Sequence, residues 1–295
     1  MSKVMESQES KNGKAFSGHW KEKGMQAVFF IAACTSILAV ALICIFLFAN
    51  GLPAIAEIGP LDFLLGKTWR PANDLYGIFP FILGSIYVTA GAIVIGVPIG
   101  ILTSIFMAEY CPAKIYRPLK AATELLAGIP SVVYGFFGML VLVPFIREAT
   151  GSKGNVMLTA CILLGIIILP TIIGTTESAL RSVTRTYYEG ALALGATKER
   201  TIFTVMLPAA KSGVLTGVVL GIGRAIGETM AVIMIAGNQT AMPTSLLKGV
   251  RTLTANIVLE MGYATGLNRE ALIATAVVLF VLILIMNLSV SFLRR

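Results

Sequence analysis

Residues 155–176 read NVMLTACILLGIIILPTIIGTT, a run of 22 residues without a charged side chain. A helix needs about 20 such residues to cross the roughly 30 Å hydrocarbon core of a bilayer. Helices are the expected form of such a segment, because lipid offers no partner to an unpaired backbone group. Four more uncharged runs lie at residues 27–49, 77–108, 125–146 and 271–292, and a sixth apolar run, 212–237, carries Arg224 and Glu228. The six runs predict an all-α membrane protein with six transmembrane helices.

The composition excludes several classes of protein. Of the 295 residues 56% are hydrophobic and 13% are charged, whereas a soluble domain has about 25% charged residues. A soluble enzyme, a disordered chain and a nucleic-acid binder are therefore excluded. The single histidine, His19, and four cysteines without metal-site spacing argue against a metal centre, a histidine-based triad or a disulfide framework. We expect no bound cofactor.

The first apolar run could be a cleaved signal peptide, because Ala54-Ile55-Ala56 resembles a cleavage site. A signal core has only about 7–15 apolar residues, so we expect an uncleaved first transmembrane helix over 27–49. It follows a polar N-terminal tail, 1–26, that we expect to be mobile, and precedes an outer loop over 50–76. The run 77–108 is too long for one upright span and predicts a tilted helix bent near Pro98.

The loop charges orient the six spans. With both termini inside, fifteen Lys and Arg residues lie on the inner side and seven on the outer side. Positive residues favour the cytoplasmic side, so we expect both termini in the cytoplasm. Residues 66–68 read GKT, the end of a phosphate-binding P-loop, but Leu61 stands where that motif has its first glycine. We expect no ATP hydrolysis by this chain.

The inner loop between spans four and five, residues 177–211, predicts a helical elbow. Residues 181–194 have the pattern of an amphipathic helix, and Gly195 follows where a helix ends favourably. Thr197 can cap a second helix, with Glu199 in its first turn. Pro208 disfavours a helical conformation at the residue before it.

The spacing in this elbow resembles the E-A-A, three residues, G, nine residues, I-x-L-P loop of ABC-importer permeases. Val205 and Leu207 are expected to hold the elbow on the cytoplasmic face. The alternative is an ordinary amphipathic linker. The resemblance implies the type I ABC importer permease fold over 77–293 and docking of the elbow on a separate ATPase subunit that binds the ATP. The matching residues, in which Gly190 and Val205 replace the usual Ala and Ile, are Glu189, Gly190, Ala191, Gly195, Val205, Leu207 and Pro208.

Arg224 and Glu228 lie inside the apolar run 212–237. An arginine at membrane depth costs at least about 2.5–3.5 kcal/mol, so lipid exposure is disfavoured. Four residues apart, the two side chains share one face of a helix and can pair. That face also carries the small residues Gly213, Gly217 and Gly221, which permit close helix approach. The pair is either part of an oxyanion pathway, since a guanidinium fork suits a tetrahedral oxyanion, or a structural clamp.

Longer strings resemble the permeases of phosphate-specific bacterial ABC importers. GIGRAIGETMAV at 221–232 and GIPSVVYG at 128–135 match this family, while RTLTANI at 251–257 and EMGYA at 260–264 match its PstC type rather than its PstA type. The resemblance implies a bacterial cell-membrane location and a PstA-type permease, a PstB-type ATPase dimer and an extracytoplasmic phosphate-binding protein as partners. It implies a substrate pathway lined by Arg224, Glu228, Thr229 and Ser131.

Two other functions remain open on the sequence. One is import of another oxyanion, which the string around Arg224 disfavours. The other is ion-coupled secondary transport, which predicts internal repeats and leaves the elbow unexplained. In the outer loop, Arg251 and Asn256 are candidates for the mouth of the pathway, and a plain structural helix is the alternative.

Overall fold

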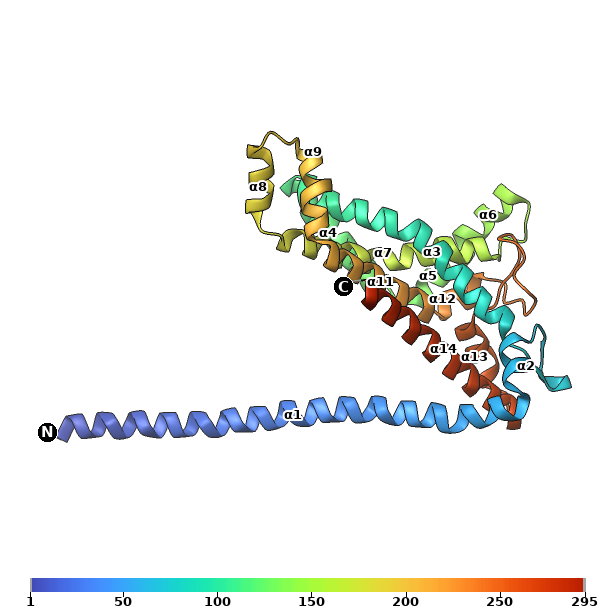
Figure 1. Ribbon diagram of the computed structural model, residues 1–295, viewed down its shortest axis with the longest axis horizontal. Coiled ribbons are helices and arrows are strands. Elements are labelled where there is room, and N and C mark those ends of the chain that lie inside the picture. The colour runs from blue at the N-terminus through green and yellow to red at the C-terminus, as the bar shows by residue number, and fades with distance from the viewer. Residues whose placement is uncertain (1, 294–295) are drawn as a thin grey trace. The chain divides into compact units, whose positions relative to one another are not determined.

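In the computed structural model, residues 2–293 have described backbone and residues 23–289 have described side chains. Helix α7 (Met157–Ser182) is the central element: 67% of its most apolar stretch is buried inside the chain. Helices α3 (Phe79–Ile105) and α11 (Lys211–Gly227) make the most extensive contacts with it (Figure 1). The run of sequence without charges thus forms the core of the fold.

Among the described residues, five helical segments are long and apolar enough to cross a membrane. A sixth span is possible if the helix pair Lys198–Ala209 and Lys211–Gly227, bent by 72°, is counted as one. The fold class predicted from sequence, an all-α membrane protein with up to six spans, is confirmed. The five single segments are Lys23–Ile58, Phe79–Tyr110, Ser131–Thr150, Met157–Ser182 and Gly266–Ser289.

The chain divides into two compact units, residues 1–50 and 51–295. The first unit consists of most of α1 (Ser2–Ile58), whose apolar segment has no buried share. This helix continues nine residues beyond the predicted end at 49. It also starts at Ser2, so the described part of the polar tail that we expected to be mobile is helical.

In the second unit, the outer segment that we expected to be a loop folds into short elements. Helix α2 (Pro60–Leu65) leads into a hairpin of β1 (Trp69–Arg70) and β2 (Leu75–Tyr76), joined by the 3₁₀ turn η1 (Pro71–Asn73). The strands pair antiparallel, with Trp69 opposite Tyr76. The indole of Trp69 packs edge-on against the rings of Tyr76 and Phe81, at 5.7 Å between centroids in each case.

The third span differs from the prediction. Residues 125–146 do not form one helix, because α4 (Ala113–Gly128) ends before Pro130 and Ile129 is extended. Proline disfavours helix at the residue before it. The spanning segment therefore starts at Ser131 and consists of α5 (Ser131–Phe137), the π-helical turn η3 (Gly138–Leu142) and α6 (Val143–Thr150).

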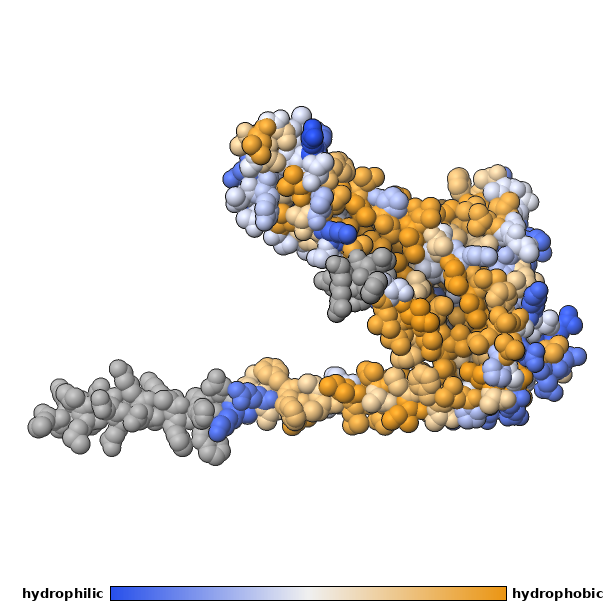
Figure 2. Space-filling view, in the orientation of Figure 1, coloured by the Kyte–Doolittle hydropathy of each residue, from blue (hydrophilic) through white to orange (hydrophobic). Residues whose placement is uncertain are grey.

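The remaining elements lie around this core. The π-helical turn η2 (Phe106–Tyr110) ends the α3 span, and Pro98 lies inside α3. Short α12 (Met230–Ile235) packs on α5, and α13 (Leu253–Met261) packs on the last helix, α14 (Gly266–Leu293). Figure 2 shows hydrophilic residues at two ends of the second unit, over α8 (Arg185–Ala193) and α9 (Lys198–Thr201) and over α2 with the hairpin, with a hydrophobic band between them.

The glycine stripe of α11, the face for which we expected close helix approach, packs against α7. A Cβ placed on Gly213 would overlap Ala179, and one on Gly221 would lie 2.9 Å from Ile172 Cγ1. In lipid, helices associate through close packing of such small residues, because the hydrophobic effect between helices is absent.

We predict that Gly221→Leu destabilises the protein, because the side chain would be forced into Ile172. Overpacking of this kind costs about 1–3 kcal/mol, which should appear as a lower midpoint of thermal unfolding in detergent. Gly223→Leu is the matched control in the same helix, since no atom of the chain lies within 4 Å of a Cβ there. Equal midpoints for the two variants would contradict the packing.

Candidate functional site

The fifth apolar run is broken in the middle of its charged motif. Helix α11 ends at Gly227, Glu228 is extended (φ −69°, ψ 125°), and α12 begins at Met230. The carboxylate of Glu228 accepts hydrogen bonds from the backbone N–H groups of Thr229 and Ala231, each at 3.2 Å. It thereby satisfies donors that the break leaves without a helical partner.

The predicted pairing of Arg224 with Glu228 is wrong. It assumed a continuous helix, whereas α11 ends at Gly227 and the Glu228 carboxylate accepts from the backbone N–H groups of Thr229 and Ala231. No ion pair joins the two within the described part of the chain. Arg224 is half-buried and donates instead from Nη1 to the hydroxyl of Thr171 on α7, at 3.3 Å. Sequence reasoning missed Thr171, although the glycine stripe indicated which face of α11 meets a neighbour.

The other two predicted pathway residues also lie at helix starts. Ser131 is the first residue of α5 and Thr229 precedes α12, whose side packs against α5 at Gly135. The hydroxyl of Thr229 donates to the carbonyl of Gly227 at 3.1 Å. Among the described residues, no hydrogen bond joins Ser131 to Arg224. The break in span five, before α12, and the break before span three, before α5, thus lie beside the contact between α12 and α5.

Helix α13 adjoins the break in span five. Thr254 Oγ1 donates to the carbonyl of Glu228 at 3.3 Å, and Ser85 of α3 accepts the backbone N–H of Leu253 at 2.9 Å. Thr252 caps α13 by accepting from the N–H of Ala255. These contacts fix the outer segment against the two central spans.

Arg251 and Asn256, our candidates for the mouth of the pathway, take part in a buried structural network. Arg251 Nη1 lies 2.7 Å from Glu260 Oε1 and 3.0 Å from Asn256 Oδ1. The other carboxylate oxygen of Glu260 accepts from Trp69 Nε1 at 2.9 Å. The side chains of the ion pair are 15% and 9% exposed. This geometry favours the alternative of a structural helix, because the charge of Arg251 is already neutralised.

The inner loop forms the predicted elbow between α8 (Arg185–Ala193) and α9 (Lys198–Thr201). Gly195 adopts φ +86°, and the N–H of Ala196 bonds to the carbonyl of Ala191 at 3.1 Å. This pattern closes a helix C-terminus around a left-handed residue. Thr197 accepts from the N–H of Arg200 at 3.3 Å, which makes it the predicted cap of the second helix.

Three details of the elbow differ from expectation. The predicted helix 181–194 is interrupted, because Val183 is extended. Leu207 is helical despite Pro208, since the π-helical turn η4 (Ile202–Met206) leads directly into α10 (Leu207–Ala209). The fully buried anchors of the elbow are Ile202 and Met206, which sequence reasoning missed, whereas Val205 and Leu207 are half-buried.

Residues 96–295 match the family model described as "Binding-protein-dependent transport system inner membrane component". The chain is 40% identical over 272 residues to the probable ABC transporter permease protein YqgH of Bacillus subtilis, covering 89% of this chain and 88% of that one. It is 35% identical to the phosphate transport system permease protein PstC of Mesorhizobium japonicum, with 81% and 80% covered. The chain belongs to this family of transport-system membrane components.

Solved structures agree on the fold of this permease. An inward-facing structure of the MetNI methionine ABC transporter matches with a TM-score of 0.59 at 20% identity, covering 77% of this chain and 98% of that one. The permease is therefore a multi-pass inner-membrane subunit with the type I ABC importer fold, and the transport system it belongs to depends on a binding protein.

The elbow of the permease presents an uncovered apolar tip. Leu194 is 92% exposed and Tyr187 is 60% exposed, and Glu189 and Gly190 are also exposed. Figure 1 shows α8 and α9 side by side at one end of the second unit. No other part of the described chain covers these side chains.

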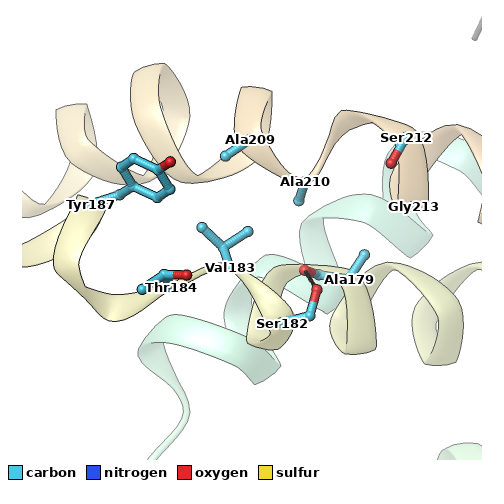
Figure 3. Close-up of a pocket in the computed structure, with 9 residues that line it drawn as sticks. All are labelled: Ala179, Ser182, Val183, Thr184, Tyr187, Ala209, Ala210, Ser212 and Gly213. Atoms are coloured by element: carbon cyan, nitrogen blue, oxygen red, sulfur yellow. Dashed lines mark hydrogen bonds between the residues drawn. The ribbon is translucent and has the colours of Figure 1, made fainter.

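A hollow of about 260 Å³ lies at the base of the elbow (Figure 3). It separates the end of α7 and the start of α8 from α10 and the start of α11. Tyr187 is the largest of its lining residues, and most of the others are small. The lining consists of Ala179, Ser182, Val183, Thr184, Tyr187, Ala209, Ala210, Ser212 and Gly213.

We predict that Gly195→Val disrupts the elbow without preventing insertion. A β-branched residue at φ +86° is strained, at a cost of about 1–3 kcal/mol, so ATP hydrolysis and transport by the assembled transporter should become uncoupled. The control is Gly190→Ala, which has open space at its Cβ and suits a helix. Normal coupling in the valine variant would contradict the role of the turn.

Proposed function

We propose that this chain is the PstC-type permease subunit of an ATP-driven, high-affinity importer of inorganic phosphate. The observation that carries the proposal is its similarity over most of its length to proteins named as phosphate permeases of the PstC type, including the one from Mesorhizobium japonicum. In this function the chain forms half of the translocation pathway and is not itself an enzyme.

The partners of such a subunit are a PstA-type permease, a PstB-type ATPase dimer and an extracytoplasmic phosphate-binding protein. The exposed elbow supports the ATPase contact, since Leu194 and Tyr187 offer apolar area at the tip of a rigid turn. ATP binding and hydrolysis by the partner would move this elbow and thereby reorient the permease pair.

Arg224 is the proposed contact for phosphate in the membrane. A guanidinium has five N–H donors in a planar fork, and within the described part of the chain its side chain makes one hydrogen bond, to Thr171. Glu228 is occupied with the backbone of Thr229 and Ala231. The arginine therefore keeps donors and positive charge for a transient anion.

We predict that Arg224→Lys lowers phosphate uptake strongly, because lysine keeps the charge but loses the fork. A hydrogen bond to a charged group contributes about 1.5–3 kcal/mol, so loss of one predicts a fall of about 10–100-fold in uptake per assembled complex. Arg224→Gln should abolish uptake. Radiolabelled phosphate uptake in vesicles, normalised to the assembled complex, measures both effects.

The double variant Arg224→Glu with Glu228→Arg tests whether the position of the cation matters for uptake. It should not restore uptake, because residue 228 lies at the helix break and a cation there would leave the face toward Thr171. Transport near the wild-type rate in the double variant would refute the pathway role.

The proposed orientation places both termini and the elbow in the cytoplasm. In a background without the four native cysteines, Lys153→Cys should react with a membrane-impermeant maleimide from outside, and Leu194→Cys only after the inner face is opened. Both positions are exposed. The opposite pattern of labelling would overturn the orientation.

A further inference from the structure

Glu177, near the end of α7, is the centre of a buried polar cluster at the base of the elbow. It is 1% exposed, although it carries a carboxylate. The phenol of Tyr116 donates to its Oε1 at 2.6 Å, Lys120 donates to Oε2 at 2.9 Å, and Arg181 Nε donates to Oε1 at 2.8 Å. A buried carboxylate is stable only with such partners.

The cluster joins α7 to two consecutive segments, η2 and the start of α4, that lie far from it in sequence. Tyr116 and Lys120 belong to α4, while Glu177 and Arg181 belong to α7. Arg181 also donates to the carbonyl of Met107 in η2 at 2.9 Å and stacks on the ring of Tyr116 at 4.6 Å. Because Lys120 donates to Glu177, the pKa of its ammonium group is raised above the ordinary value, so it stays charged.

Both helices of the elbow, α8 and α9, contact the end of η2. Arg185, the first residue of α8, donates to Glu109 at 3.1 Å. Lys198, the first residue of α9, lies 4.4 Å from the ring centre of Tyr110. Glu109 and Tyr110 are consecutive residues at the end of η2. The elbow, η2 and the start of α4 are thus connected by polar contacts on this side.

The far end of α4 reaches the region of the predicted pathway. The hydroxyl of Tyr134 in α5 donates to the carbonyl of Leu126 in α4 at 2.7 Å. Helix α5 packs in turn against α12, which follows the break at Glu228. A continuous series of direct contacts therefore runs from the elbow through Glu177 and α4 to the break.

We propose that Glu177 is a positioning residue for energy coupling: its contacts with Lys120 and Tyr116 make α4 move with the elbow and so transmit elbow movement to span three. The inference rests on the proposed function, since it needs an ATPase-driven elbow. The hollow in Figure 3 also lies at the elbow base, between the end of α7 and the start of α11.

The test removes the Lys120 contact and keeps Glu177, because Lys120 is partly exposed (30%) and its loss should be tolerated by the fold. The complete transporter, with its ATPase and binding-protein partners, is reconstituted in liposomes, and phosphate uptake and ATP hydrolysis are measured together. Lys120→Met should lower phosphate moved per ATP about 2- to 30-fold, the range expected for residues that carry coupling. Lys120→Arg should retain most of it.

Lys114→Met is the matched control, because Lys114 lies exposed on the same helix with no ion pair in the described part of the chain. A second readout is the distance between spin labels at positions 117 on α4 and 200 on the elbow. Addition of ATP should leave that distance unchanged in the parent protein, and should change it in Lys120→Met.

The outcomes separate the two proposals. If the parent transporter couples ATP hydrolysis to phosphate uptake and Lys120→Met keeps the same ratio at equal assembly, the role of Glu177 is refuted. If Lys120→Met lowers only the amount of assembled complex and leaves the ratio and the label distance as in the parent, the cluster is structural and the inference is also refuted. A parent complex that hydrolyses ATP and carries no phosphate refutes the proposed function instead.

Discussion

The close approach of α7 to its two neighbours is the contact on which the rest of the structure depends. On α3, a Cβ at Gly96 would lie 2.8 Å from the carbonyl oxygen of Gly165, and one at Gly100 would lie 2.8 Å from Ile172. The glycines of α11 pack on the same helix, and a Cβ at Gly221 would also lie against Ile172. In lipid these contacts supply the association through van der Waals packing. They also set the distances at which Arg224 reaches Thr171 and Glu177 reaches α4.

Breaks in the spans occur where another group satisfies the backbone. At Glu228 the residue's own carboxylate accepts two N–H groups, and Thr254 donates to its carbonyl. At Pro130 the ring has no N–H to satisfy, and Leu126 of the preceding turn receives the Tyr134 hydroxyl. Unpaired backbone groups are costly at membrane depth, so each break required a specific side chain near it.

This explains which features the sequence could predict. Hydrophobic run length identified the spans, and glycine spacing identified the face of α11 that meets α7, because both depend on neighbouring residues alone. Gly195 and Thr197 were predictable for the same reason, since a turn and a cap are local. The spacing of Arg224 and Glu228 gave a wrong prediction of an ion pair. Helix α11 ends between the two residues, where the Glu228 carboxylate accepts backbone N–H groups, and hydrophobic periodicity does not reveal such a contact. The Glu177 cluster involves residues 61 and 57 positions apart in sequence, and no local pattern indicates such a contact.

The distribution of carboxylates sets Arg224 apart from Arg251 and Lys120, two other half-buried cations. Glu260 pairs with Arg251, and Glu177 pairs with both Lys120 and Arg181. Each of these pairs lies at an end of the spanning helices, where it fixes a loop or a short helix. Within the described residues, Arg224 is in an apolar span and has a hydroxyl, not a carboxylate, as its partner. A fixed carboxylate would compete with any passing anion, whereas a neutral hydroxyl holds the guanidinium in place and leaves its charge uncompensated. The same helix break that separates Glu228 from Arg224 therefore determines the electrostatic character of the site.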